Sequence, residues 1–202
     1  MKIAVIGASG MVGSRVVSEL AGRGHDVTAV TRSGAEVAGA KTSMAGNLGD
    51  ADFISKLAAD HEVLFSATGP SRTGEDHQLW LDALQTAEAN AGDSRLFVVG
   101  GAGSLLVDGT RLVDQPDFPE AYKAESLSAA QALETIRQAP ESLDWVFLSP
   151  APEIAPGERT GTYRTADDTP VGDNISAEDF AVAVADEIEQ PKHRRARFTV
   201  AN

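Results

Sequence analysis

The chain has 202 residues, of which 17 are lysine or arginine and 30 are aspartate or glutamate, so its net charge is −13. This acidic balance argues against nucleic acid and anionic membrane surfaces as partners, because both are bound through basic side chains. The absence of cysteine excludes disulfides, thiolate nucleophiles and cysteine-based zinc sites.

The length fits one domain. No membrane span is expected, because the longest uncharged apolar stretch, residues 96–107, is interrupted by glycines and is shorter than the ~20 residues that a span needs. The apolar run after Lys2 is also too short for a signal-peptide core, so we expect a cytoplasmic protein.

Short apolar runs alternate with amphipathic segments along the chain. The runs predict strands over residues 3–6, 26–31, 40–45, 62–66, 95–99 and 144–148. The amphipathic segments predict helices over residues 11–23, 50–59, 77–91 and 119–139. Such alternation is typical of parallel βαβ units, so we expect an α/β fold with a doubly wound parallel sheet of the Rossmann type.

The character of the sequence changes after Pro152. Residues 153–174 are polar and contain several glycines, residues 176–189 predict a helix that begins with a capping sequence, and residues 197–200 predict a last strand. The short basic cluster at residues 193–197 predicts a solvated face. We therefore expect one domain over residues 1–202, with a core over 1–152 and a small C-terminal substrate-side subdomain over 153–202.

Three glycines separate the first predicted strand from the first predicted helix. Gly7, Gly10 and Gly13 have the spacing G-x-x-G-x-x-G. In this context Gly7 permits a tight turn, Gly10 lets the backbone approach a pyrophosphate, and Gly13 lets the helix pack close to the strand. The helix N-terminus then offers free N–H groups to the phosphates. The alternative is a plain strand-to-helix turn; a P-loop is excluded, because no Gly-Lys-Ser/Thr follows.

The end of the second predicted strand bears on the choice of dinucleotide. An NAD site needs an acidic residue there, whereas this strand ends in Thr31-Arg32-Ser33. A guanidinium suits a 2′-phosphate through charge-assisted hydrogen bonds. The sequence therefore predicts NADP(H) as the preferred cofactor, with NAD(H) as the alternative if Arg32 is only a solvated surface residue.

Several segments together resemble a known family. With GASGMVGSR, TRS, GGAGSLLVDG, DFPEAYKAE, DWVFLSPAP and GERTGTYR, the chain resembles the bacterial NADH-flavin reductases, which are atypical short-chain dehydrogenases similar to NmrA-like proteins and to biliverdin-IXβ/flavin reductases. The resemblance covers nearly the whole chain. It implies a Rossmann fold that binds NAD(P)H, and a flavin such as FMN or a small carbonyl compound as substrate.

The resemblance also implies a set of cofactor contacts. Those to the pyrophosphate and the 2′-phosphate would come from Gly7, Ala8, Ser9, Gly10, Met11, Val12, Arg32 and Ser33. Those to the adenine and its ribose would come from Asn47, Leu48, Ala67, Thr68 and Gly69, and those to the nicotinamide end from Gly100, Gly101, Pro150 and Ala151, with Lys123 as a ribose or phosphate contact or a surface residue. Glu36 stands where some relatives carry a second basic residue, which keeps NAD(H) open.

The usual catalytic pair of short-chain dehydrogenases is missing. That pair is Tyr-x-x-x-Lys, but Ser126 stands four residues after Tyr122, and Asp167 four residues after Tyr163. Reduction of a ketone needs a proton donor at the developing alkoxide. A flavin accepts hydride on a ring nitrogen and delocalises the charge, so the absence favours flavin or quinone-like acceptors.

Three residues are candidates for a catalytic role. Tyr122 is one, His77 is a candidate proton donor, and Ser104 is a candidate for orienting the substrate, with backbone capping as its alternative. The scattered histidines predict no metal site.

Two classes of function follow. The first is an NADPH-dependent reductase that transfers hydride to a flavin or to a small quinone or carbonyl acceptor, as a monomer or homodimer. The second is an NmrA-like redox sensor that binds the dinucleotide without turnover. A sugar-nucleotide epimerase is a weaker third option, because the chain is short for one and lacks the Tyr-Lys pair.

Overall fold

An eight-stranded sheet runs through the computed structural model, which describes residues 1–202. Its strands are β1 (Lys2–Ile6), β2 (Asp26–Thr31), β3 (Thr42–Ala45), β4 (Val63–Ser66), β5 (Arg95–Val99), β8 (Trp145–Pro150), β10 (Arg164–Ala166) and β12 (Ala196–Ala201). Their order is β10-β12-β8-β5-β4-β1-β2-β3, and all neighbours are parallel except β10 and β12. The predicted doubly wound α/β sheet is confirmed.

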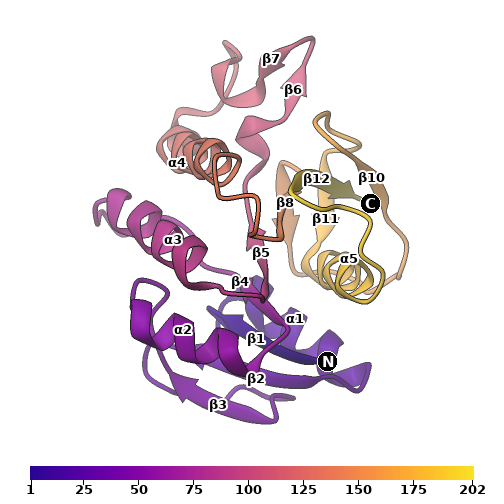
Figure 1. Ribbon diagram of the computed structural model, residues 1–202. Helices are drawn as coiled ribbons and strands as arrows, with labels where there is room; N and C mark the ends of the chain where they lie inside the picture. Colours follow the sequence, from indigo (N-terminus) through magenta and orange to yellow (C-terminus); the bar gives the residue numbers. More distant parts are fainter.

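Helices cover both faces of this sheet (Figure 1). One face carries α1 (Met11–Gly22) and α5 (Ala177–Glu189), and the other carries α2 (Ala51–Asp60), α3 (Gln78–Asn90) and α4 (Glu120–Ile136). None of these helices combines the length and the apolarity that crossing a membrane requires.

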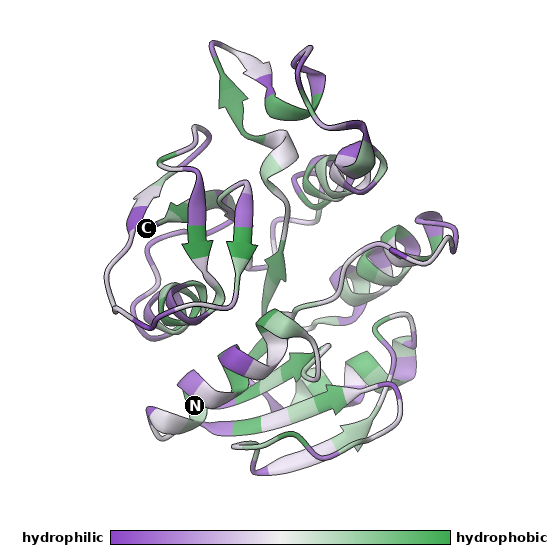
Figure 2. Ribbon diagram, turned by 180° about the vertical axis from the view of Figure 1, so that it is seen from behind, coloured by the Kyte–Doolittle hydropathy of each residue, from purple (hydrophilic) through white to green (hydrophobic).

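Burial on both faces explains why the central strands are continuous apolar runs. Side chains alternate along a strand, so Ile3 and Val5 pack toward α1 and α5, whereas Ala4 and Ile6 pack toward the opposite layer. Figure 2 shows the result as hydrophobic colour along the strands and hydrophilic colour on the outer surfaces of helices and loops.

Smaller elements extend from the carboxyl ends of the central strands. After β5 come η1 (Ala102–Ser104), a hairpin of β6 (Leu106–Val107) and β7 (Thr110–Arg111), and η2 (Leu112–Asp114). Asp108 and Gly109 turn the hairpin with φ of 50° and 79°, the Asp-Gly combination that tight hairpins favour. After β8, the short β9 (Glu153–Ala155) pairs with β11 (Asn174–Ser176).

The C-terminal residues divide between two places, which differs from the expected single subdomain over 153–202. β12 joins β8 in the main sheet, and α5 packs along α1 with most of its residues buried. Residues 153–176 stay outside the main sheet, apart from β10 at its edge, although Ile175 is part of the core. The reason is that α1 alone cannot cover this face of the sheet, so a second apolar helix must bury the face of β5 and β8.

The basic cluster is not the solvated face that its sequence predicts. Arg195 has a φ of 51°, and its guanidinium donates to the carbonyls of Ala139, Pro140 and Leu143, at 2.8, 2.6 and 2.8 Å. Arg197 is buried and pairs with Asp168, and His193 pairs with Glu187. Among the four, Arg194 is the exposed one, with 70% of its side chain accessible. The cluster therefore ties the turn after α4 to the start of β12.

Replacing Arg195 with alanine removes three hydrogen bonds to carbonyls that no other side chain satisfies. Because hydrogen bonds to a charged group contribute about 1.5–3 kcal/mol, we expect Arg195→Ala to lower the free energy of unfolding by about 2 kcal/mol in urea titrations. The adjacent Arg194→Ala is the matched control and should cost less than about 1 kcal/mol, as an exposed ion pair does. Equal losses in the two variants would contradict this role of Arg195.

Candidate functional site

The turn from β1 to α1 requires glycine at two positions for reasons internal to the chain. Gly7 has a φ of 81°, and a Cβ there would lie 3.0 Å from the carbonyl oxygen of Ala67. A Cβ on Gly13 would lie 2.2 Å from the carbonyl oxygen of Gly7, which no side chain can do. These glycines let the turn bend and let α1 approach β1 closely.

Gly10 differs, because a Cβ there would meet one protein atom, the Gly7 carbonyl oxygen at 3.3 Å. It is the N-cap of α1 in extended conformation, with φ −74° and ψ 172°. Most residues adopt these angles, and the one close contact would require a shift of a few tenths of an ångström, so the protein itself restricts this position less strictly than Gly7 or Gly13. A bare backbone at this point leaves room for another molecule to approach it.

The N-terminus of α1 has no protein partner for its free amides. No side chain caps it, its first turn contains no acidic residue, and the N–H groups of Met11, Val12 and Gly13 donate to no protein atom. In contrast, Asp50 caps α2 and Ser176 caps α5, each through its side chain. Three unpaired donors and the positive end of the helix dipole can hold an anion.

This helix terminus lies where the direction of winding reverses. From β1 the chain goes through α1 to β2 and β3 on one side, and β4 and β5 lie on the other side. The close approach of Gly7 to Ala67 joins the carboxyl ends of β1 and β4 at that point. Ligands of open α/β sheets bind outside the strand ends at such a switch point.

A cleft of about 1000 Å³ opens at this edge of the sheet. The residues predicted to contact cofactor or substrate that line it come from four strand ends and from α4: Met11, Val12, Ala67, Thr68, Gly69, Gly100, Gly101, Tyr122, Pro150 and Ala151. The fold thus brings together segments that are up to about 140 residues apart in sequence, because the carboxyl ends of parallel strands meet at one edge.

The predicted 2′-phosphate contacts lie beyond the cleft, at the end of β2. Arg32 and Ser33 are both exposed there. Arg32 makes no hydrogen bond or ion pair with the protein, whereas every other arginine makes at least one. Its guanidinium is therefore free to bind an anion without breaking an existing pair.

The predicted adenine contacts after β3 are placed differently from each other. The side-chain carbonyl of Asn47 accepts a hydrogen bond from the amide of Gly49. The side chain of Leu48 is buried in the core beneath α2 and α3. Leu48 can therefore offer a ligand only its backbone.

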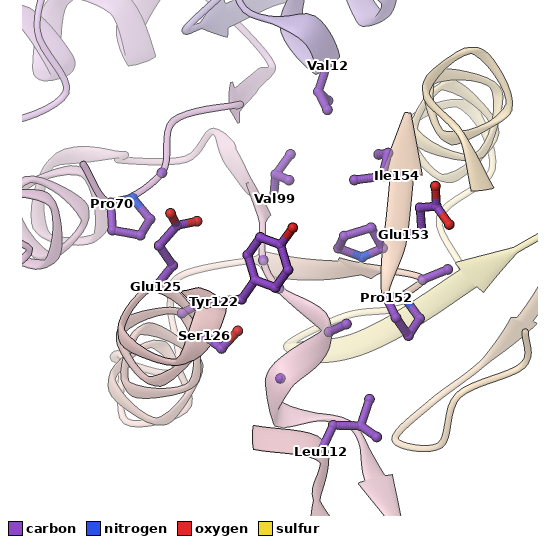
Figure 3. A pocket seen from close by; sticks show the side chains of 18 of the residues that line it. Val12, Pro70, Val99, Leu112, Tyr122, Glu125, Ser126, Pro152, Glu153 and Ile154 are labelled. Carbon is purple, nitrogen blue, oxygen red and sulfur yellow. The ribbon is translucent and has the colours of Figure 1, made fainter. Parts of the chain in front are cut away.

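Tyr122 is the candidate catalytic residue that the structure places in the cleft. It is 60% exposed, and its hydroxyl makes no hydrogen bond with the protein. Figure 3 shows its ring extending from α4 into the middle of the pocket, below Val99 in this view and toward the segment that carries Ile154. The other tyrosine, Tyr163, donates to Asp186 at 2.7 Å, and burial together with this bond raises its pKa well above the usual range.

His77 and Ser104 do not line the cleft. His77 Nδ1 lies 2.8 Å from Ser128 Oγ and Nε2 lies 2.9 Å from the Ser71 carbonyl oxygen, so the ring joins the loop after β4 to α4. Ser104 is buried, and its Oγ accepts from Arg197 Nη1 at 3.2 Å. Both side chains are held by structural partners, and the catalytic roles expected for them do not fit these positions.

Lys123 also falls outside the cleft. It is adjacent to Tyr122 on α4 and therefore points about 100° away around the helix. Its ammonium group lies 3.7 Å from Glu120 on the surface. Of the two roles expected for Lys123, its location therefore fits a surface residue better than a contact to the nicotinamide ribose.

Several cleft residues were not predicted from the sequence. Arg72 Nε lies 3.0 Å from Glu125 Oε2 across the mouth of the cleft. Trp80 Nε1 donates to Thr68 Oγ1 at 3.2 Å, which orients Thr68 at the end of β4. The sequence does not reveal these two pairs. Each pair joins a loop residue to a helix residue, and the distance between them depends on how α3 and α4 pack.

Comparison with known proteins agrees with this geometry. A family model described as NAD(P)H-binding matches residues 7–191. The uncharacterized protein YwnB of Bacillus subtilis is 38% identical over 217 residues, which cover 100% of this chain and 99% of YwnB.

Two solved structures are similar along their whole length. A Streptococcus pneumoniae protein, named a putative NADH-flavin reductase, is 32% identical with a TM-score of 0.92, covering 100% of this chain and 99% of that one. A Burkholderia pseudomallei protein, named a putative exported protein, is 41% identical with a TM-score of 0.88, covering 100% of both chains. The resemblance inferred from the sequence motifs is confirmed, whereas the cytoplasmic location stays a prediction. The chain belongs to the NAD(P)H-binding family, with a Rossmann fold that carries its cleft at the glycine turn.

Proposed function

We propose that this protein is an NADPH-dependent reductase that transfers hydride to a flavin or to a small quinone or carbonyl acceptor. The observation that carries the proposal is the uncapped N-terminus of α1, which presents three unpaired amides where the ends of β1 and β4 meet. A dinucleotide diphosphate is the family ligand whose chemistry matches such donors.

The remaining parts of the cofactor would follow the edge of the sheet. Arg32 and Ser33 would hold the 2′-phosphate, Asn47 and the backbone of Leu48 would flank the adenine, and residues 67–69 would pass the ribose. The nicotinamide end would lie against Gly100, Gly101, Pro150 and Ala151 at the ends of β5 and β8. When bound, the cofactor supplies the hydride, and the protein supplies position and exclusion of water.

The cleft favours acceptors that need little help with protonation. Tyr122 has no lysine four residues later, and no side chain of the protein makes a hydrogen bond to its hydroxyl. A ketone needs a proton at the moment the alkoxide develops, so a proton donor that is not held in place would make reduction of a ketone slow. Flavins and quinones delocalise the charge that they receive, and correct placement of the two rings is then the main requirement.

The same observation supports a second candidate, an NmrA-like sensor that binds the dinucleotide without turnover. Nothing in the cleft holds a proton donor in place, and a sensor needs none. The two functions separate in one assay, because both bind the cofactor and only the reductase consumes it.

The first test is NADPH oxidation by the purified protein with riboflavin, FMN or menadione as acceptor, followed by the loss of dihydronicotinamide absorbance. We expect turnover with at least one acceptor, since the chemistry is carried by the two ring systems.

The variant Gly10→Val should bind NADPH at least tenfold more weakly, because a branched side chain would stand where the diphosphate approaches. Cofactor binding without oxidation of NADPH by any acceptor would instead support the sensor.

The second test concerns the choice between the two dinucleotides. Arg32→Ala should raise the Kd for NADPH about tenfold or more, since hydrogen bonds between charged groups contribute about 1.5–3 kcal/mol and 1.4 kcal/mol is a factor of ten. The Kd for NADH should change less than about twofold, because it lacks the 2′-phosphate. Arg194→Ala, exposed and remote, serves as the control for charge alone. An equal loss for both dinucleotides would contradict the assignment of Arg32.

A further inference from the structure

Charged side chains are unevenly placed around the cleft. One of the lining residues is basic, Arg72, and three are acidic, Glu125, Glu153 and Asp173. Arg72 is paired with Glu125 at 3.0 Å, so its charge is already balanced. The Arg72 side chain is also 81% exposed to solvent, and no other residue that lines the cleft is basic, so the wall around Tyr122 contains no cation for an anionic substrate group.

The wall around Tyr122 is largely apolar. Leu112, Phe118, Pro152 and Ile154 line the cleft together with Tyr122. In Figure 3, Ile154 is directed into the pocket, and Glu153 lies on the other side of the same strand, as alternation along β9 requires. Glu125 lies beside Pro70, away from Leu112 and Ile154. A ring placed against Tyr122 meets apolar surface and the phenol.

This arrangement discriminates by charge. A phosphate, sulfonate or carboxylate that enters an apolar wall loses its hydration and is stabilised only if a cation or several donors replace the water. Around Tyr122 such a partner is missing, because the free amides of α1 are taken by the cofactor diphosphate under the proposed function, and the unpaired charges among the lining residues, Glu153 and Asp173, are negative. A neutral aromatic ring incurs neither penalty and packs favourably on tyrosine and on apolar side chains.

We propose that the acceptor is an uncharged, planar aromatic molecule, such as a quinone or an unphosphorylated flavin, and that the cleft discriminates against the same ring bearing an anionic group. This inference rests on the reductase function proposed above. In the reaction the acceptor gains two electrons and one proton as hydride from NADPH, which is oxidised to NADP⁺. A second proton comes from water, so a quinone leaves as its hydroquinone.

The direct test compares riboflavin with FMN, which share one ring system and differ by a phosphate. With NADPH as donor, we expect kcat/KM for riboflavin to exceed that for FMN by at least tenfold. Menadione should exceed its sulfonated derivative in the same way. Quenching of flavin fluorescence by the protein loaded with NADP⁺ should give the same order of Kd values, independently of turnover.

A substitution that adds a cation to the wall should reverse the preference. Phe118→Arg should raise the ratio of FMN to riboflavin activity at least tenfold, whereas Phe118→Leu, the matched control for loss of the ring, should leave the ratio within about twofold. Circular dichroism and thermal unfolding of both variants establish that they fold, and the comparison of ligands on the unaltered protein needs no variant.

The possible failures are distinct. NADPH oxidation with FMN as efficient as with riboflavin would overturn the charge discrimination and leave the reductase function in place. Binding of NADPH without oxidation by any of the four acceptors would overturn the reductase function and this inference with it.

Discussion

The structure depends on the close contact between the start of α1 and the ends of β1 and β4. Gly13 must approach the Gly7 carbonyl, and Gly7 must adopt a positive φ beside Ala67. Only then does the first turn of α1 point its amides along the edge of the sheet where the cleft opens. A capping side chain or an acidic residue in that turn would satisfy the amides internally, and neither is present.

This contact explains how an acidic chain can bind a ligand that is itself negative. With a net charge of −13, the protein has few cations to spare, and its arginines other than Arg32 are engaged in contacts within the chain. Under the proposed function, the attraction for phosphate would come from main-chain dipoles, which carry no net charge and are unaffected by the composition of the surface. Arg32 adds charge at one point, at the end of β2, where it distinguishes one dinucleotide from the other under the proposed function.

The sequence was sufficient for the parts of the fold that depend on local pattern. The six predicted strands that precede Pro152 are all present. Five of them are buried parallel strands that are recognisable as short apolar runs, whereas β3 is a half-exposed strand with a weaker pattern. The roles of Gly7 and Gly13 within the turn also followed from their spacing. The structure shows both glycines to be required by close backbone contacts.

What the sequence could not provide were contacts between distant segments. Ser104 is held by Arg197, 93 residues later, and His77 by Ser128, so neither residue faces the cleft. The basic cluster is structural because its partners lie in turns that only the tertiary packing brings near. In the same way, α5 belongs to the core, since burial of one face of the sheet demanded a second helix.

The most direct measurement is an NMR titration of the ¹⁵N-labelled protein with NADP⁺, observing backbone amides. The account predicts that the largest shifts fall on Ser9, Met11, Val12 and Gly13, and that the capped amide of Asp179 at the start of α5 does not move. Saturating binding with the amides of the first turn of α1 unchanged would contradict the claim that this helix terminus seats the diphosphate.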